Sequence, residues 1–343
     1  MFRVKAPLAK KVQLVAMMGK PENNGYSALA KEPYDMTQDQ DGFWSVTTAP
    51  PGPGYYEYTF LIDGVVTMDL GSTTTFSGDH ETSHIEVPAQ EPTFYDVQNV
   101  PHGDVRQHGY HSDITGKWRR ALVYTPPEYD ANPTRRYPVL YLQHGGTQNE
   151  TSWLTGGKAN FILDNLIAAG QAVPMLVVMD NGSTFPPGLT RLPDPPPPDN
   201  PFERVMVNEI VPMVDATYRT APHREHRAMA GLSMGSHQTL QIALAHLDVF
   251  SHIGVFSPAP TAFDVHTIYG GVLANAAAIN RQVRLFWWGA GTAEVAIYEG
   301  VKYRLARLDE VGVKYVFREW PGLAHEWRLW RRSLHDLASR LFR

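Results

Sequence analysis

The sequence predicts two domains of different class, an all-β sandwich followed by an α/β domain with a mostly parallel sheet. Two observations predict this division. Residues 1–88 alternate polar and apolar side chains in short stretches separated by turn residues, as the strands of a half-buried sandwich do. From Tyr137 onward, nearly continuous apolar runs alternate with helical patterns, which is typical of parallel strands covered by helices on both faces. At 343 residues the chain is long enough for both domains.

The first domain is predicted from four alternating stretches and the turns between them. Strands are expected at 12–15, 43–46, 55–62 and 84–87. The pairs Asp41-Gly42 and Asp63-Gly64 are strong turn signals, and the second of them predicts a hairpin after the strand at 55–62. Residues 89–111, rich in proline, glycine and polar side chains, are expected to be a linker to the second domain at 112–343.

The second domain is predicted from apolar runs and helical patterns in alternation. Its strands are expected at 139–142, 175–179, 285–288 and 313–317, and its helices at 159–169, 202–218, 296–311 and 326–341. A proline-rich segment at 182–201 follows the second of these strands. Its position predicts a loop at the C-terminal edge of the sheet, where ligands of such sheets bind.

Composition describes an ordinary globular protein and argues against several functional classes. Apolar residues make up 43% of the chain and charged residues 19%, which is enough for a sizeable core. A net charge of −5 without a basic stripe gives no indication of nucleic acid or an anionic membrane surface as a partner. No apolar run is long enough to cross a bilayer. The absence of cysteine excludes disulfides, thiolate metal sites and a cysteine nucleophile.

The N-terminus has no apolar segment of the kind found in signal peptides, and residues 2–4 already alternate like a strand. The chain is therefore expected to begin inside a domain, any leader having been removed. A removed leader would make the protein secreted or periplasmic, and otherwise it would be cytoplasmic. The composition is compatible with either compartment and with any oligomeric state.

Gly231-Leu232-Ser233-Met234-Gly235 is a G-x-S-x-G pentapeptide between an apolar run at 227–230 and an apolar helical pattern. Strand, sharp turn and helix are the context in which this motif forms a nucleophile elbow. The turn lifts the serine hydroxyl above the sheet, and the small flanking residues let the backbone fold tightly. The motif therefore predicts an α/β-hydrolase fold with Ser233 as the nucleophile.

An α/β-hydrolase presents its catalytic residues in the chain order serine, acid, histidine. Glu294 is the only carboxylate in the loop that follows the strand at 285–288, and Asp264, after the preceding strand, is the alternative acid. His325 follows the last strand, whereas His335 falls within the final helix. Such a histidine takes the serine proton, and the acid fixes the imidazole tautomer and stabilises the imidazolium. Ser233, Glu294 and His325 are thus the expected catalytic residues.

The oxyanion that forms during acyl transfer needs two preorganised N–H donors. One is expected from the backbone of Met234, directly after the nucleophile. The other is expected from His144-Gly145-Gly146-Thr147, which follows the strand at 139–142 and matches the loop that supplies this donor in α/β-hydrolases. Gly146 is the expected residue, and Thr147 is the alternative.

Three aromatic residues lie in loops expected near the pocket: Trp153, Phe185 and Trp327. Each could stack on a phenolic acyl group or a sugar ring, and ordinary packing is the alternative for each.

Several histidines and aspartates gather near the expected linker: His102, Asp104, His108, His111 and Asp113. Their spacing fits no metal-binding motif, so neither a metal nor an organic cofactor is expected.

Motifs in both halves resemble known families. Residues 137–146, 231–235, 256–258, 291–294 and 321–327 resemble the esterase D superfamily, in particular carbohydrate esterase family 1, which holds feruloyl and acetylxylan esterases. Residues 43–46 and 53–60 resemble the immunoglobulin-like early-set sandwich of carbohydrate-binding module family 48. Three features depart from the esterase pattern: Ser236 where a second glycine is usual, Glu294 where aspartate is usual, and the proline-rich segment.

The resemblance implies a serine carboxylesterase that acts on ester substituents of plant cell-wall polysaccharide through an acyl-enzyme on Ser233. Feruloyl esters of arabinoxylan, or of feruloylated oligosaccharides, are the expected substrates. An acetylxylan esterase and a siderophore esterase of the enterochelin type are alternatives within the fold. A glycan-binding protein that has lost hydrolase activity is the alternative from another class.

Overall fold

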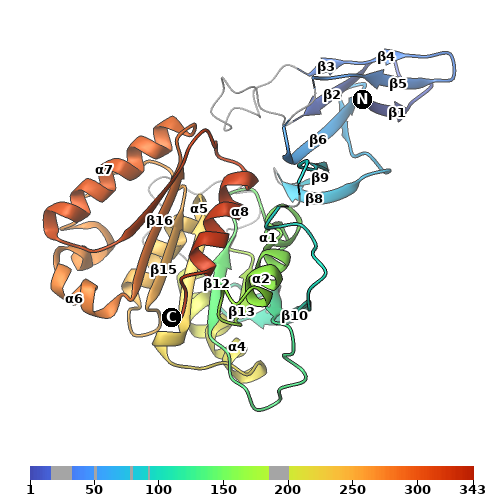
Figure 1. Cartoon of the computed structure of the whole chain (residues 1–343). Coiled ribbons are helices and arrows are strands. Elements are labelled where there is room, and N and C mark those ends of the chain that lie inside the picture. The colour runs from blue at the N-terminus through green and yellow to red at the C-terminus, as the bar shows by residue number, and fades with distance from the viewer. Residues whose placement is uncertain (17–32, 50–51, 78–79, 92, 185–200) are drawn as a thin grey trace.

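The computed structural model describes residues 1–16, 33–49, 52–77, 80–91, 93–184 and 201–343, and Figure 1 shows the arrangement of the chain. A small β-structured part at the N-terminus projects from one end of a larger part in which helices surround a central sheet (Figure 1). No helix among the described residues is long and apolar enough to cross a membrane.

The N-terminal part consists of two antiparallel sheets, with strand orders β1-β5-β4 and β3-β2-β6-β9-β8, and β7 pairs with β6. The strands are β1 Phe2–Lys5, β2 Val12–Ala16, β3 Tyr34–Asp35, β4 Thr37–Gln38, β5 Phe43–Val46, β6 Gly54–Ile62, β7 Val65–Thr67, β8 Thr73–Ser77 and β9 His80–Val87. The four predicted strands coincide with β2, β5, β6 and the second half of β9. Buried Leu14, Trp44 and Phe60 fill the core between the sheets, as the alternating pattern predicts.

The hairpin between β6 and β7 turns at Asp63-Gly64. Both residues have left-handed backbone angles, with φ of 50° and 86°, which a two-residue hairpin turn of the primed type requires. The Asp63 carboxylate also accepts hydrogen bonds from the backbone amides of Lys10 and Lys11 at 2.9 and 2.8 Å. The predicted turn is therefore fixed by its own backbone and by a neighbouring loop.

The larger part is built on one sheet of order β10-β11-β13-β12-β14-β15-β16-β17. Pairs β10–β11 and β11–β13 are antiparallel, and all the other pairs are parallel. The strands are β10 Asp104–Ser112, β11 Lys117–Thr125, β12 Val139–Gln143, β13 Leu176–Asp180, β14 Arg227–Leu232, β15 His252–Phe256, β16 Leu285–Gly291 and β17 Val316–Trp320. Every residue of β12 through β15 is buried, which explains their continuous apolar runs.

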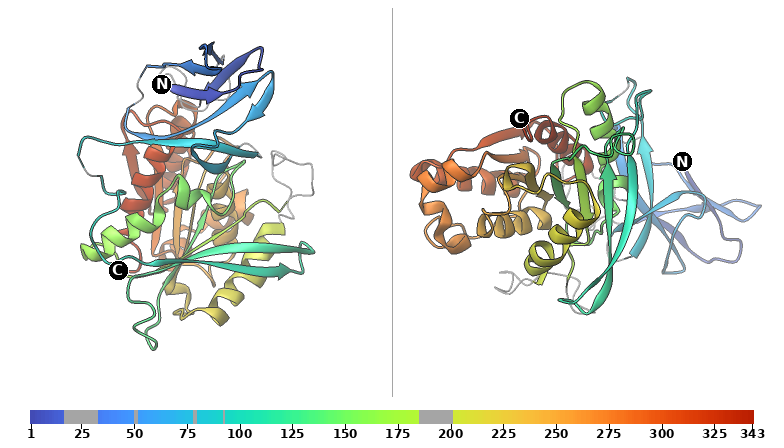
Figure 2. Two further views of the ribbon diagram at one scale, coloured as in Figure 1. Left: turned by 90° about the vertical axis from the view of Figure 1, so that its right-hand side faces the viewer. Right: turned by 90° about the horizontal axis from the view of Figure 1, so that it is seen from below.

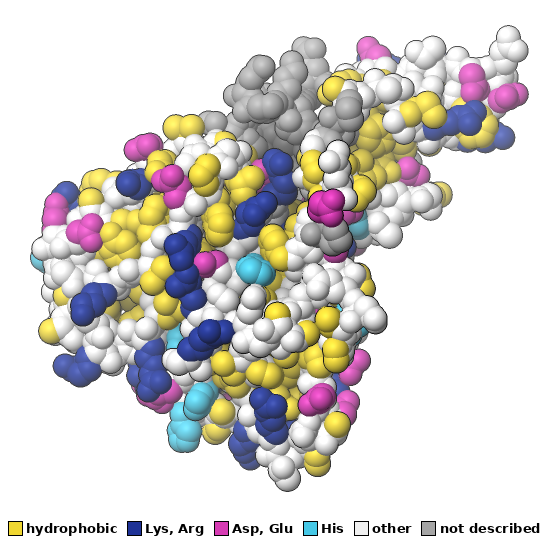
Figure 3. All heavy atoms as spheres, in the orientation of Figure 1, with side chains coloured by type: hydrophobic (Ala, Val, Ile, Leu, Met, Phe, Trp, Pro, Cys, Tyr) yellow, Lys and Arg dark blue, Asp and Glu magenta, His cyan; other side chains and the backbone are white. Residues whose placement is uncertain are grey.

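Helices cover both faces of this sheet, as Figure 2 shows. Helices α1 and α2 pack with α8 on one face, and α3 to α7 pack on the other. The helices are α1 Ser152–Thr155, α2 Ala159–Ala168, α3 Pro201–Val205, α4 Val211–Thr217, α5 Met234–Ala245, α6 Ala276–Gln282, α7 Val295–Val311 and α8 Trp327–Ala338, with 3₁₀ turns at Arg224–His226 and Ile268–Ala274. Lys and Arg side chains gather near α8 on the face drawn in Figure 3.

Three expectations differ from the structure. The strand expected at 313–317 is β17, which begins three residues later and runs from Val316 to Trp320. The helix expected at 202–218 is α3 and α4 joined by a π-helical turn, Met206–Ile210. Pro212 lies at the start of α4 and has no N–H to continue the α-helical ladder, which explains the wider turn before it. Residues 104–111, expected in the linker, form most of β10. This edge strand is largely exposed, so its polar composition resembles that of a linker.

Candidate active site

The nucleophile elbow has the geometry that its sequence predicts. Ser233 stands between β14 and α5 with φ 51° and ψ −114°, a strained conformation for a residue with a side chain. A Cβ atom at Gly231 would lie 2.4 Å from the Gly235 carbonyl oxygen, and one at Gly235 would lie 2.5 Å from that of His144. Ser236 is fully buried and its hydroxyl donates to the Ser233 carbonyl oxygen. The glycines permit the tight turn, and the hydrogen bond from Ser236 stabilises it.

The structure brings Glu294 and His325 together. The distance between Glu294 Oε2 and His325 Nδ1 is 2.8 Å, and the two side chains are 1% and 9% exposed. This hydrogen bond places the proton of the neutral ring on Nδ1 and leaves Nε2 as an acceptor. Asp264 instead binds the amide of His266 and the Thr267 hydroxyl in an exposed loop. The geometry therefore favours Glu294 over Asp264 as the partner of the histidine.

The second oxygen of Glu294 accepts two further hydrogen bonds. Ser257 Oγ donates to Oε1 at 2.7 Å, and the backbone amide of Gly291 donates to it at 2.9 Å. Trp330 Nε1 donates to Ser257 Oγ at 3.3 Å, and the Trp330 ring meets the His325 ring edge-on at a centroid distance of 4.8 Å. Sequence reasoning missed Ser257 and Trp330. The motif at 256–258 points to Ser257 only through the family resemblance, and that resemblance assigns the residue no role.

The loop after β12 packs against the elbow. A Cβ atom at Gly145 would lie 2.6 Å from Leu232 Cδ1 and 3.6 Å from the Ser233 Cβ. Met234 is the first residue of α5, where backbone amides have no partner within the helix. No described residue accepts a hydrogen bond from the amides of Met234, Gly146 or Thr147. Two candidate oxyanion donors thus lie on segments that meet beside Ser233.

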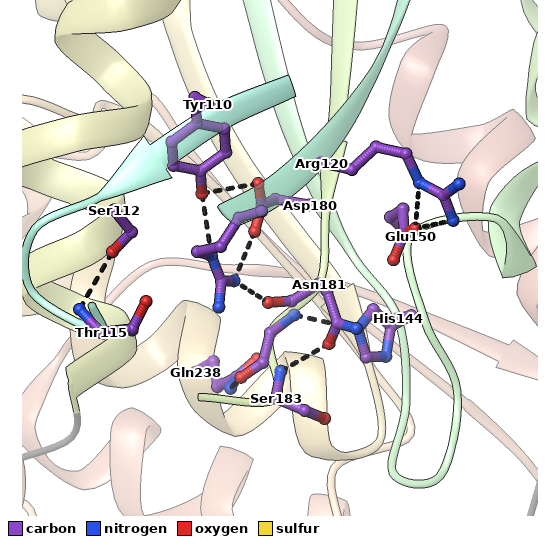
Figure 4. A network of polar contacts seen from close by, with 12 residues as sticks. Tyr110, Ser112, Thr115, Arg120, His144, Glu150, Asp180, Asn181, Ser183 and Gln238 are labelled. Atoms are coloured by element: carbon purple, nitrogen blue, oxygen red, sulfur yellow. Dashed lines mark hydrogen bonds and ion pairs between the residues drawn. The ribbon is translucent and has the colours of Figure 1, made fainter. Parts of the chain in front are cut away.

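His144 fixes the course of this loop (Figure 4). Its Nδ1 lies 2.7 Å from the Gly145 carbonyl oxygen, and its Nε2 accepts from the Gly182 amide at 2.9 Å. Gln238 Nε2 donates to the Gly182 carbonyl oxygen at 2.9 Å. Burial lowers the pKa of His144, so the ring is neutral and carries its proton on Nδ1. The loop after β12 and the segment after β13 are thereby joined through one buried imidazole.

A second set of polar contacts anchors the same region (Figure 4). Arg119 and Tyr110 both bind the buried Asp180 carboxylate, at 2.7 and 2.9 Å. Arg120 Nε lies 2.6 Å from Glu150 Oε1, which ties β11 to the loop that carries Gly146. These pairs lie at the C-terminal edge of β13 and hold the surroundings of the elbow in place.

Two of the three aromatic residues expected near the pocket are buried. Trp153 is 1% exposed and donates through Nε1 to the Gln143 carbonyl oxygen at 2.8 Å. Trp327 is 6% exposed and packs edge-on against Trp153 at 5.4 Å. Both rings belong to one core cluster with α8, which favours the packing alternative for both. Phe185 lies outside the described residues.

The histidines near the expected linker have separate partners. His102 pairs with Asp164 at 2.8 Å, and His111 pairs with Asp113 at 3.0 Å. Among the residues that the structure describes, no group of three or more His, Asp or Glu side chains could hold a metal ion.

Comparison with known proteins shows the family of the chain. The model of the Esterase family matches residues 112–341. The chain belongs to this family. It is 35% identical to an endo-1,4-beta-xylanase/feruloyl esterase of Xylanibacter ruminicola over 347 residues, which cover 100% of this chain and 44% of that protein. The chain thus spans less than half the length of this curated relative.

Solved structures extend the comparison to the fold. A CE1 ferulic acid esterase of Anaeromyces mucronatus superimposes with a TM-score of 0.62 at 25% identity, covering 73% of this chain and 96% of that one. The enterobactin esterase of Shigella flexneri superimposes with a TM-score of 0.67 at 17% identity, covering 98% of this chain and 92% of that one. The second likeness concerns the fold alone, and it includes the N-terminal sandwich.

Proposed function

We propose that the protein is a serine carboxylesterase in which Ser233 is the nucleophile. The Ser233 hydroxyl oxygen attacks the ester carbonyl carbon while His325 takes the hydroxyl proton on Nε2. Glu294 accepts from Nδ1 and stabilises the imidazolium. Collapse of the tetrahedral intermediate passes that proton to the departing alcohol oxygen and leaves the acyl group on Ser233. A water deprotonated by His325 then releases the acid and restores the serine.

The oxyanion of each tetrahedral intermediate is assigned to backbone donors. The amide of Met234 is one donor, and that of Gly146 is the other, with Thr147 as the alternative. Such a donor commonly contributes about 3 kcal/mol to transition-state stabilisation. The positions of the two segments beside Ser233, and the absence of a described acceptor for these amides, support the assignment. No step of this mechanism uses a metal or an organic cofactor.

The proposed substrates are feruloyl esters on plant cell-wall polysaccharide, arabinoxylan in particular, or on feruloylated oligosaccharides. The observation that carries this proposal is the 35% identity to the endo-1,4-beta-xylanase/feruloyl esterase, because it extends over the whole chain. The fold likeness to a CE1 ferulic acid esterase at 25% identity supports the same assignment.

The N-terminal sandwich is proposed to be an early-set domain of the kind found in carbohydrate-binding module family 48. Two observations support this proposal. The described residues before position 88 form two antiparallel sheets around their own core, and the likeness to the enterobactin esterase covers 98% of the chain. A division into a sandwich at residues 1–88 and an α/β domain follows from it, and β10 moves the start of the second domain from the expected residue 112 to Asp104.

Side-by-side assays test the substrate proposal. Methyl ferulate is expected to give the highest kcat/KM, and faster turnover of acetylated xylan or of a catecholate siderophore would assign the enzyme to acetylxylan or siderophore hydrolysis instead. Ser233→Ala is expected to remain folded and to lose turnover of every ester. Persistent turnover by this variant would refute the mechanism. A wild-type protein that neither hydrolyses an ester nor reacts with a fluorophosphonate would favour the alternative of a glycan-binding protein without hydrolase activity.

A further inference from the structure

We infer that the N-terminal sandwich positions the catalytic histidine, through Glu86 and Tyr55 on its strands and Arg331 and Trp327 on α8. The inference rests on the proposed role of His325 and adds residues that lie outside the esterase domain. In Figures 1 and 2 the sandwich lies over the end of the α/β part at which α8 begins. His325 stands two residues before α8, so whatever holds the first turns of this helix also places the imidazole.

The first turns of α8 present two indole rings and a guanidinium on one side. Trp327, Trp330 and Arg331 are spaced i, i+3 and i+4, which puts them on a common helix face. All three are buried, and Arg331 is among the largest fully buried side chains of the described chain. This face is directed toward α1 and the sandwich rather than toward solvent.

A continuous series of ring contacts leads from the sandwich to the histidine. Tyr55 on β6 meets Trp327 edge-on at a centroid distance of 6.4 Å, and Trp327 meets Trp330 at 5.1 Å. Trp330 in turn meets His325 at 4.8 Å with perpendicular ring planes. A Cβ atom at Gly156 would lie 2.3 Å from the Trp327 ring, so the ring has no room to shift toward α1.

An ion pair fastens the same helix to the last strand of the sandwich. Arg331 Nη1 and Nη2 each lie 2.7 Å from one oxygen of Glu86 on β9, and Arg331 Nε donates to the Gly156 carbonyl oxygen at 2.7 Å. The guanidinium also lies 4.3 Å from the centroid of the Tyr95 ring. The Arg331 side chain is 0% exposed and that of Glu86 is 30% exposed. A buried guanidinium needs such a two-point partner, because its charge has lost its water.

The segment that holds His325 is also braced next to the sandwich. Arg328 binds both carboxylate oxygens of Glu326 at 2.7 and 3.0 Å, and Glu326 Oε1 accepts from the Ala324 amide at 3.3 Å. A Cβ atom at Gly54 on β6 would lie 3.0 Å from Arg328 Cδ. The residues on both sides of His325 are therefore tied to one arginine that packs on the sandwich.

Through these contacts the sandwich positions His325 and takes no direct part in the reaction. Each sandwich residue named here contacts α8 or the turn that precedes it, and acts on His325 through that helix. Loss of these contacts would let the imidazole shift relative to Ser233 and Glu294. Small displacements of a catalytic group slow the chemical step while leaving a small ester free to bind. The expected defect is therefore in kcat rather than in KM.

The test uses the full chain with Glu86→Gln and Tyr55→Leu. Glu81→Gln is the matched control, because Glu81 lies on the same strand, is exposed and loses the same charge. The substrate is methyl ferulate, and the rate of Ser233 labelling by a fluorophosphonate is measured in parallel. Both test variants are expected to lower kcat about 10- to 100-fold with KM within about 2-fold of wild type, and to slow labelling to a similar degree. Tyr55→Phe, which keeps the ring, is expected to retain most of the activity.

Circular dichroism and a melting curve establish that each variant is folded at the assay temperature. Should Glu86→Gln fail to fold, Tyr55→Leu alone decides. Folded test variants with wild-type kcat and labelling rates would overturn the inference, and so would a rise in KM alone, since that would mean direct contact with substrate. A wild-type protein that is neither labelled nor active on any ester would instead overturn the proposed function.

Discussion

The α/β domain and the sandwich contribute to the site in different ways. The α/β domain carries the three proposed catalytic residues, which lie in the segments that follow β14, β16 and β17. The sandwich supplies none of them, and its contacts to the site run through α8. The contribution of the α/β domain can be recognised from short sequence motifs. That of the sandwich depends on contacts between residues far apart in the chain. The difference teaches that a domain boundary in sequence need not be a boundary in function.

The largest effects are expected in the α/β domain at His325. His325→Gln should lower kcat/KM for methyl ferulate at least about 10,000-fold, because losing the base of such a triad costs nearly as much as losing all three members. His335→Gln is the matched control, since His335 lies in the same helix region and packs on Phe94. Steady-state assays of both variants measure the contrast. Comparable losses in the two would mean that His325 has no special role.

Glu294 is expected to follow with a smaller loss. Glu294→Gln keeps the shape but removes the charge that stabilises the imidazolium, so kcat should fall about 1,000- to 10,000-fold. Glu294→Asp should retain part of the activity, because it keeps the carboxylate but shortens its reach to His325. Asp264→Asn should have no effect, and a severe loss in that variant with an active Glu294→Gln would exchange the two assignments. The measurement is kcat at saturating methyl ferulate.

Substitution of Ser257 should lower kcat less than substitution of Glu294, because Ser257 acts on the histidine only through Glu294 and Trp330. Ser257→Ala removes one donor to Glu294 and the acceptor of the Trp330 indole. A hydrogen bond to a charged group contributes about 1.5–3 kcal/mol, so kcat should fall about 10- to 100-fold. The same assay with Ser257→Thr, which keeps the hydroxyl, should recover part of the loss. An unchanged kcat in Ser257→Ala would mean that Ser257 does not help to position Glu294 and His325.

The smallest effects are expected in the pH dependence of the free energy of unfolding. One buried group in each domain should change this free energy with pH, in opposite directions. Burial lowers the pKa of His252 on β15 to about 4, so this residue's contribution to stability is present above pH 6.5 and is lost as the pH falls toward 4. Burial raises the pKa of Glu57 on β6 above 4.5, so its contribution is present below 4.5 and is lost as the pH rises through the raised pKa.

Thermal midpoints at pH 5 and pH 7 measure this contrast. Glu57→Gln should stabilise the protein more at pH 7 than at pH 5, whereas His252→Gln should make the loss of stability between pH 7 and pH 5 shallower. The His252 effect is expected to be on the order of 2 kcal/mol, and the Glu57 effect has the opposite sign. Equal shifts at the two pH values in both variants would mean that neither group titrates with folding.

Much of the fold follows from periodicity in the sequence. The strands β2 and β5 alternate because one face is buried, whereas β6 is buried on both faces along most of its length. Strands β12 to β16 are almost continuously apolar because both of their faces are buried. Strand β10 was not predicted, because an exposed edge strand has a polar composition like that of a linker. The helix at 202–218 was predicted without the π-helical turn that Pro212 imposes.

The site was predictable where one short motif specifies one position. Ser233 is fixed by the elbow, whereas the partner of His325 required the structure, because Glu294 and Asp264 both follow strands of the sheet. Trp153 and Trp327 illustrate the limit, since an aromatic residue in a loop near the pocket can equally be a core residue. Glu86 and Arg331 lie 245 residues apart, and no local pattern could have paired them.

Trapping of the acyl-enzyme is the measurement that tests the central claim most directly. The full chain is mixed with an activated feruloyl ester, quenched in acid during turnover, digested and mapped by mass spectrometry. The account predicts a feruloyl group on Ser233, and no such adduct in Ser233→Ala. An acyl group on another residue, or hydrolysis by the Ser233→Ala variant at the wild-type rate, would contradict it.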